Sequence, residues 1–233
     1  MRVGRPGART GDVLDVLRAH GPAELVTVPA GASRSTVDEV LSTVDGRRLV
    51  VIADLAGLSM VVLRLLRRSL LGSVTVGAVV DSPQWTRAVG LPADPVAAAR
   101  VAATGAPAGL RLARDDQGGI LLHAATLRPW TGRRFGVRGY VEDAELVNAP
   151  VRAISVGPDG DALRAVARPG IPHRARALRG RAVTLSCQDA RLTVDGTDLP
   201  NPRRRATWWL DEARWLLVPP VIRPARPDSA PVG

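Results

Sequence analysis

Residues 49–68 read LVVIADLAGLSMVVLRLLRR, and this stretch organises the chain. The continuous apolar run 49–53 predicts a β-strand covered on both faces. A helix is predicted next, because one side of it collects the apolar residues Leu55, Leu58, Val62, Leu65 and Leu66. Many α/β proteins bind phosphate at such a turn, where backbone N–H groups at the helix start point at the ligand. The turn ADLAG, residues 53–57, has one glycine, one acid and a leucine, so it predicts a poor phosphate cradle.

Composition excludes several kinds of chemistry. The chain has 233 residues, 45% of them hydrophobic, enough for one large domain or two small ones. Its single cysteine, Cys187, allows no intrachain disulfide, and its three histidines show no metal-binding spacing, so no metal site is predicted. All 32 basic residues are arginine, which excludes a P-loop lysine, Schiff-base enzymes and pyridoxal phosphate enzymes.

The net charge of +10 attracts nucleic acid or anionic lipid. One Tyr and one Phe argue against recognition of single strands by stacking, so the nucleic-acid signal is weak. The Arg, Ala, Val, Gly and Pro bias is typical of a GC-rich genome and accounts for part of the charge. The N-terminus has no apolar core of a signal peptide, and residues 49–63 are too short to span a bilayer. We therefore expect a cytoplasmic protein that can lie peripheral to a membrane; the sequence does not indicate an oligomeric state.

A change of pattern near residue 107 predicts two domains. Residues 1–107 alternate strands with helices, as in a parallel α/β layer. Two helix starts are predicted there, one with Thr36 as N-cap and Glu39 completing a capping box, the other with Asp94 as N-cap before Pro95. Residues 108–220 contain short strands separated by turn signals, which predicts an antiparallel β domain. Among these strands are 182–187 and 191–194, and 206–210 and 215–218 with a turn signal at Asp211-Glu212 between them. The Pro/Arg-rich residues 221–233 predict a disordered tail.

Three stretches resemble the catalytic domain of diacylglycerol kinases, the family of bacterial lipid kinases. The first is residues 49–68, where the family has a strand, a GGDGT turn and a helix. The second, TRAVGLPADPVAAARVAATG at residues 86–105, is similar to the segment after the family's GTGND motif. The third, residues 179–220, is similar to the family's C-terminal end, where a VDGE turn precedes a last hairpin ending in LLVP. DDQGG-ILLHAA, residues 115–125, also resembles the start of the family's β domain.

The resemblance implies an N-terminal α/β domain like that of NAD kinases and a C-terminal antiparallel β-sandwich, here shortened between about Thr126 and Val183. It implies ATP bound between the two domains, with magnesium, and ATP-dependent phosphorylation of the hydroxyl of a diacylglycerol-type lipid. The implied partner is a lipid substrate or a membrane surface.

The residues at the motif positions depart from the family. The GGDGT turn falls on Ala53, Asp54, Leu55, Ala56 and Gly57, so leucine occupies the position of the aspartate credited with catalysis. Leucine can neither accept a proton nor hold a magnesium-bound phosphate. The GTGND motif falls on Val80, Asp81, Ser82, Pro83 and Gln84, and the VDGE turn retains Asp195 and Gly196 but has Thr197 in place of the acid.

The resemblance thus implies Asp54 and Asp195 as candidate catalytic residues. It implies Ala53, Ala56, Gly57, Asp81, Ser82, Gly196 and Thr197 as the degenerate nucleotide-binding positions. From the residues alone, Asp54 is equally an N-cap and Asp195-Gly196 a hairpin turn. We expect weak or lost kinase activity. The alternatives are a non-catalytic lipid- or partner-binding protein (a pseudokinase) and, as the weakest, a nucleic-acid binder.

Overall fold

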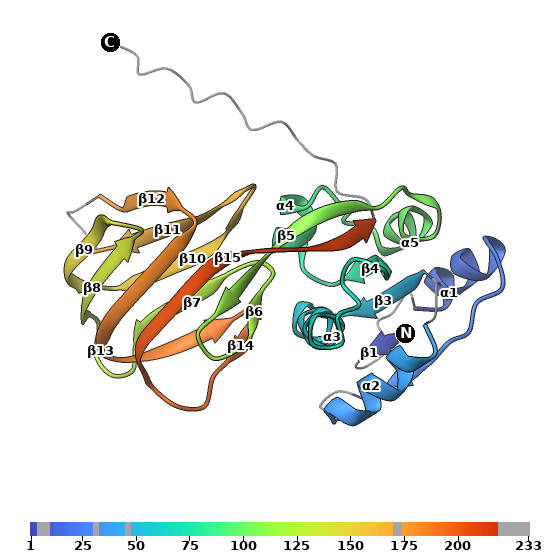
Figure 1. Ribbon diagram of the computed structural model, residues 1–233, viewed down its shortest axis with the longest axis horizontal. Helices are drawn as coiled ribbons and strands as arrows, with labels where there is room; N and C mark the ends of the chain where they lie inside the picture. Colours follow the sequence, from blue (N-terminus) through green and yellow to red (C-terminus); the bar gives the residue numbers. More distant parts are fainter. Residues whose placement is uncertain (4–9, 30–32, 45–47, 170–173, 219–233) are drawn as a thin grey trace, which may run out of the picture. The chain divides into compact units, whose positions relative to one another are not determined.

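The computed structural model describes residues 1–3, 10–29, 33–44, 48–169 and 174–218, and the predicted disordered tail lies outside this range. The chain divides into two compact units (Figure 1). The first contains Met1–Leu110 and the described residues from Trp215 onward, and the second is Arg111–Arg214. Residues 215–218, which the sequence pattern assigned to the β domain, therefore belong to the α/β unit.

The first unit is built on a parallel sheet. Its strands pair in the order β4 (Thr75–Val80), β3 (Leu49–Ala53), β1 (Arg2–Val3) and β2 (Thr27–Val28). The end of β15, a strand spanning Arg203–Val218, adds to the free edge of β4 in parallel. This pairing across 140 residues of sequence has no local signal.

Helices cover both faces of this sheet. α1 (Thr10–Ala19) and α5 (Pro95–Thr104) form a core with Val50 and Ile52 of β3. Val50 and Ile52 are half-buried there, while Val51 points to the opposite face and is fully buried, so the prediction of a strand covered on both sides is confirmed. α3 (Leu55–Arg67) contacts β3 and buries its apolar side, and α2 (Arg34–Ser42) contacts α3. None of the described helices is long and apolar enough to cross a bilayer.

Two details of the predicted helices are corrected. The N-cap of α2 is Ser33, whose side chain accepts a hydrogen bond from the Thr36 N–H at 3.2 Å, so Thr36 lies inside the helix and the predicted capping box is wrong. Pro83 begins a short helix, α4 (Pro83–Ala88), where no helix was predicted. By contrast, Asp94 caps α5 through the Ala97 N–H at 2.8 Å, as expected.

A close contact between β4 and α5 yields a prediction. A Cβ atom at Gly77 would lie 2.7 Å from the Ala102 Cβ and 2.9 Å from the Ala102 carbonyl oxygen. Gly77→Ala is expected to lower the free energy of unfolding by about 1–3 kcal/mol, because the backbone of α5 must move away from the sheet. Urea denaturation measures this. Gly72→Ala is the control, since nothing lies within 4 Å of a Cβ there; equal effects of the two substitutions would contradict the packing.

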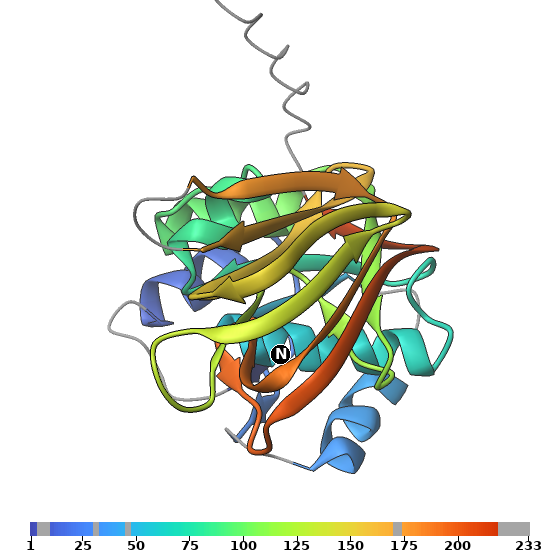
Figure 2. The same ribbon diagram turned by 90° about the vertical axis from the view of Figure 1, so that its left-hand side faces the viewer.

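The second unit is antiparallel β-structure around one apolar core. Its strands face the viewer in Figure 2. They are β5 (Ala108–Asp115, whose first three residues belong to the first unit), β6 (Ile120–Leu121), β7 (Ala125–Pro129), β8 (Phe135–Val141), β9 (Ala144–Val151), β10 (Ala153–Asp159), β11 (Ala162–Arg168), β12 (Arg176–Gly180), β13 (Ala182–Val194), β14 (Thr197–Asp198) and most of β15. This antiparallel region confirms the predicted fold class.

Two long strands, β13 and β15, each replace a pair of predicted short ones. β13 runs through the expected break after Cys187 because it bulges between Ser186 and Ala190. Its first part pairs with β8 and β15, and its last part with β7. β15 likewise runs through the predicted turn at Asp211-Glu212. The hairpin of β8 and β9 was not predicted, and it fills part of the region that was expected to be short.

Candidate functional site

The turn between β3 and α3 is closed on itself. Asp54 has extended backbone and is the N-cap of α3, and its Oδ1 accepts a hydrogen bond from the Gly57 N–H at 2.7 Å. Its carbonyl accepts from the Leu58 N–H at 3.1 Å. Leu55 is only 7% exposed and belongs to the apolar core. The carboxylate of Asp54 therefore sits where an anionic ligand of the helix N-terminus would bind.

Gly57 shows how little room this turn has. A Cβ atom there would lie 2.9 Å from the Ala53 Cβ, 3.2 Å from the Asp54 Oδ1 and 3.2 Å from the Val3 Cβ. The glycine thus serves the close packing of strand, turn and helix. Gly57 is the only glycine left in this motif turn. Its place is explained by close packing, and its N–H is used by the Asp54 cap.

The second motif segment lies beside the first. Ala53 pairs with Val80, and the Asp81 N–H donates to the Ala53 carbonyl at 3.2 Å, so both segments meet at the carboxyl ends of β3 and β4. Asp81 is exposed. Ser82 is the N-cap of α4 but makes no capping bond with its side chain. The fold therefore brings together two aspartates, Asp54 and Asp81, where the resemblance implies nucleotide phosphates.

Asp195 holds a turn in the second unit. It is 4% exposed, and its carboxylate accepts hydrogen bonds from three backbone groups: Leu122 N–H at 2.9 Å, His123 N–H at 2.8 Å and Ala124 N–H at 3.1 Å. Its own N–H donates to the Ala124 carbonyl at 2.9 Å. The carboxylate thus fixes the segment between β6 and β7 against the β13–β14 hairpin.

The Asp195-Gly196 turn is the predicted hairpin turn. Asp195 has φ of 47° and Gly196 φ of 86°, the left-handed pair that a two-residue hairpin loop requires. Thr197 follows in β14, pairs with Val194 and is exposed. The predicted site residues thus fall into two groups, one in each unit: Ala53, Asp54, Ala56, Gly57, Asp81 and Ser82 in the first, and Asp195, Gly196 and Thr197 in the second.

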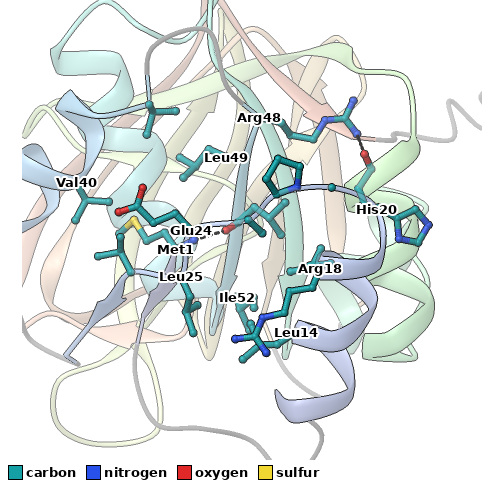
Figure 3. Close-up of a pocket in the computed structure, with 18 of the residues that line it drawn as sticks. Met1, Leu14, Arg18, His20, Glu24, Leu25, Val40, Arg48, Leu49 and Ile52 are labelled. Carbon is teal, nitrogen blue, oxygen red and sulfur yellow. Dashed lines mark hydrogen bonds between the residues drawn. The ribbon is translucent and has the colours of Figure 1, made fainter.

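A cavity of about 920 Å³ lies elsewhere in the first unit, between α1, the segment 20–26, α2 and β3 (Figure 3). Three of its polar groups are bound to backbone carbonyls. Arg48 Nη1 donates to Ala102 and Ala103 at 3.0 and 2.6 Å, the His20 ring nitrogen lies 2.7 Å from the Val16 carbonyl, and the Met1 amino group donates to Val50 at 2.8 Å. None of the predicted site residues lines this cavity.

The described residues include one free thiol, that of Cys187. Burial raises the pKa of the Cys187 thiol to about 11, so it stays protonated at neutral pH and is a poor nucleophile. Among the described residues, no group of three or more His, Cys, Asp or Glu side chains is arranged to hold a metal ion.

Comparison with protein-family models and with curated proteins gives no match. Solved structures do match. A diacylglycerol kinase from Bacillus anthracis superposes with a TM-score of 0.70 at 11% identity, over 93% of this chain and 95% of that one. A putative diacylglycerol kinase from the same organism gives 0.73 at 9% identity, over 93% and 96%. An NAD kinase from Archaeoglobus fulgidus in complex with ATP gives 0.58 at 10% identity, over 95% and 94%.

The chain therefore has the fold shared by diacylglycerol kinases and NAD kinases, as the three sequence stretches implied. The motif residues of the first unit do not fit the phosphates of a nucleotide with its magnesium. The Gly57 N–H is already bonded to a carboxylate, the adjacent acid is exposed Asp81, and buried Leu55 occupies the position where the resemblance implies an aspartate.

Proposed function

We propose that this chain is a non-catalytic protein on the diacylglycerol kinase fold, which acts by binding a lipid surface or a partner and does not transfer phosphate from ATP. One observation carries the proposal: the Asp54 carboxylate occupies the Gly57 N–H at the start of α3. A fixed negative charge at this helix end repels a triphosphate, and the N–H group that would bind it is taken.

The competing function is ATP-dependent phosphorylation of a diacylglycerol-type lipid, with magnesium. It has the support of the fold, since two of the matched structures are described as diacylglycerol kinases and a third was solved with ATP. Phosphoryl transfer needs positioned phosphates, charge neutralisation and a group that orients or deprotonates the nucleophile. Asp54 is the only acid in the first motif turn, and its side chain is engaged in capping.

Calorimetric titration of Mg-ATP into the purified chain tests the proposal. We expect no saturable heat, and no transfer of label from ATP to diacylglycerol presented in detergent micelles. Asp54→Asn keeps an N-cap and removes the charge; if this charge excludes ATP, weak binding of Mg-ATP appears in the variant. Asp94→Asn is the matched control, because Asp94 caps α5 in the same way, and it should leave the titration flat.

Saturable binding of Mg-ATP to the unaltered chain, with transfer to the lipid that Asp54→Ala abolishes, would contradict the proposal and establish a lipid kinase that uses Asp54.

A further inference from the structure

A tryptophan lies exposed among arginines at one end of the second unit. Trp130, which directly follows β7, is 37% exposed. We call this surface the Trp130 face. It consists of Arg128, Trp130, Arg133, Arg134, Asp189, Arg191 and Arg204, all of them exposed.

Strand pairing and side-chain contacts hold this face together. Arg128 of β7 lies opposite Arg191 of β13, and the Arg191 guanidinium lies 5.5 Å from the centre of the Trp130 ring. The backbone N–H of Trp130 donates to the backbone carbonyl of Asp189 at 3.1 Å. The backbone of residue 130 is thus held to β13, and the only contact described for the indole is with Arg191.

The charge of the Trp130 face is strongly positive. Its only acid, Asp189, accepts a hydrogen bond from Arg204 Nε at 2.6 Å, and this bond lowers the pKa of the Asp189 carboxyl group. Within the described part of the chain, Arg128, Arg133 and Arg134 form no ion pair. Arg133 and Arg134 follow Trp130 in the connection between β7 and β8, residues 130–134. This connection loops out beside the strands (Figure 2).

We propose that the Trp130 face binds the surface of an anionic lipid bilayer. An indole is stable at the level of lipid headgroups, and arginine binds phosphate through several donors. A small apolar anchor combined with a basic patch is the usual arrangement of a protein that lies on a membrane without entering it. This inference rests on the binding role proposed above and names the surface and its partner.

Nucleic acid is a weaker fit for the same charges. Binding of single strands uses several aromatic rings in a row. Trp85, Trp208 and Trp215 are buried, and the Trp209 ring lies against the Arg114 guanidinium at 5.8 Å. Trp209 is half-buried, so Trp130, at 37%, is the only one of the five tryptophans that is exposed, and Arg191 already lies against its ring.

Co-sedimentation of the full-length chain with vesicles tests the inference. We expect binding to phosphatidylcholine vesicles that contain phosphatidylserine, little binding to phosphatidylcholine alone, and a steep loss of affinity with added salt. The double variant Arg133→Glu/Arg134→Glu should bind roughly tenfold to a hundredfold more weakly. Trp130→Ala should weaken binding at low and at high salt, because it removes the apolar contact. Circular dichroism shows whether each variant is folded.

The control is Arg87→Glu/Arg100→Glu, which changes the net charge equally at exposed positions of α4 and α5 in the first unit. It should retain most of the binding. An equal loss in the control and the Trp130-face variant would overturn the inference, since net charge would then explain the binding. Absence of binding to anionic vesicles at low salt, or tighter binding to DNA than to vesicles, would also overturn it.

These assays contain no ATP, so they fail or succeed independently of the proposed loss of phosphate transfer. A chain that transfers phosphate in micelles yet binds vesicles through the Trp130 face would contradict only the non-catalytic assignment.

Discussion

Replacing Asp195 with alanine is expected to lower the free energy of unfolding by about 3 kcal/mol or more. The reason is that three backbone N–H groups, of Leu122, His123 and Ala124, lose their common acceptor. The carboxylate is 4% exposed, so water reaches these donors poorly once it is gone. Alanine is also less tolerant of the left-handed backbone at this position, where φ is 47°.

Urea denaturation measures the effect, and two variants define its cause. Asp195→Asn keeps one acceptor oxygen and tolerates the left-handed backbone, so an intermediate loss is expected. Asp198→Ala removes an exposed acid of the same hairpin, whose partner is the Thr193 hydroxyl, and should change stability by no more than about 0.5–1 kcal/mol. Equal effects of Asp195→Ala and Asp198→Ala would show that the buried hydrogen bonds contribute little.

Asp195 was a candidate catalytic residue because it retains the aspartate, though not the following glutamate, of the family's VDGE turn. Its hydrogen bonds give it a structural task in the second unit that does not depend on a ligand. If structure is its only task, Asp195→Asn should leave any vesicle binding unchanged after correction for the folded fraction.

Restoring the motif acid by Leu55→Asp is expected to lower the free energy of unfolding by about 2–5 kcal/mol and to produce no phosphate transfer. Leu55 is 7% exposed in the first turn of α3. The substitution removes an apolar side chain from the core and places a carboxylate there. The Gly57 N–H stays bonded to Asp54, so the new acid has no phosphate to act upon.

Thermal and urea unfolding, together with the micelle transfer assay, measure both parts of this prediction. Leu55→Met preserves volume and should cost less than about 1.5 kcal/mol. Ala56→Asp places the same acid one residue further on, at a half-buried position near the helix start, where a negative charge is tolerated better. Phosphate transfer by Leu55→Asp would refute the view that the turn is closed to ATP.

Several elements could be predicted because their signals are local. The apolar run of β3, the apolar side of α3, the N-cap Asp94 before Pro95 and the Asp195-Gly196 turn each depend on residues within a few positions of one another. Backbone geometry and capping act over that same distance, so short patterns suffice for them. The alternation of strands and helices also suffices for the class of the first unit.

The tertiary structure decided what depends on distant residues. Strand β15 continues past its predicted turn because its end pairs with β4, and β13 continues past its predicted break because its two parts have different partners. The choice of Ser33 as a cap and the start of α4 at Pro83 are smaller corrections of the same local signals.

The two candidate acids, Asp54 and Asp195, differ in how much the sequence alone indicates about them. The residue types at positions 53–57, with one glycine, an acid and a leucine, predict a poor phosphate cradle, and this stays a prediction. The bond from the Gly57 N–H to Asp54 is a local cap, which the sequence offered as one reading of Asp54. That Asp195 binds three N–H groups more than 70 residues away required the folded chain. A sequence names the donors and acceptors, but which distant ones meet is set by the packing of the β13–β14 hairpin on residues 122–124.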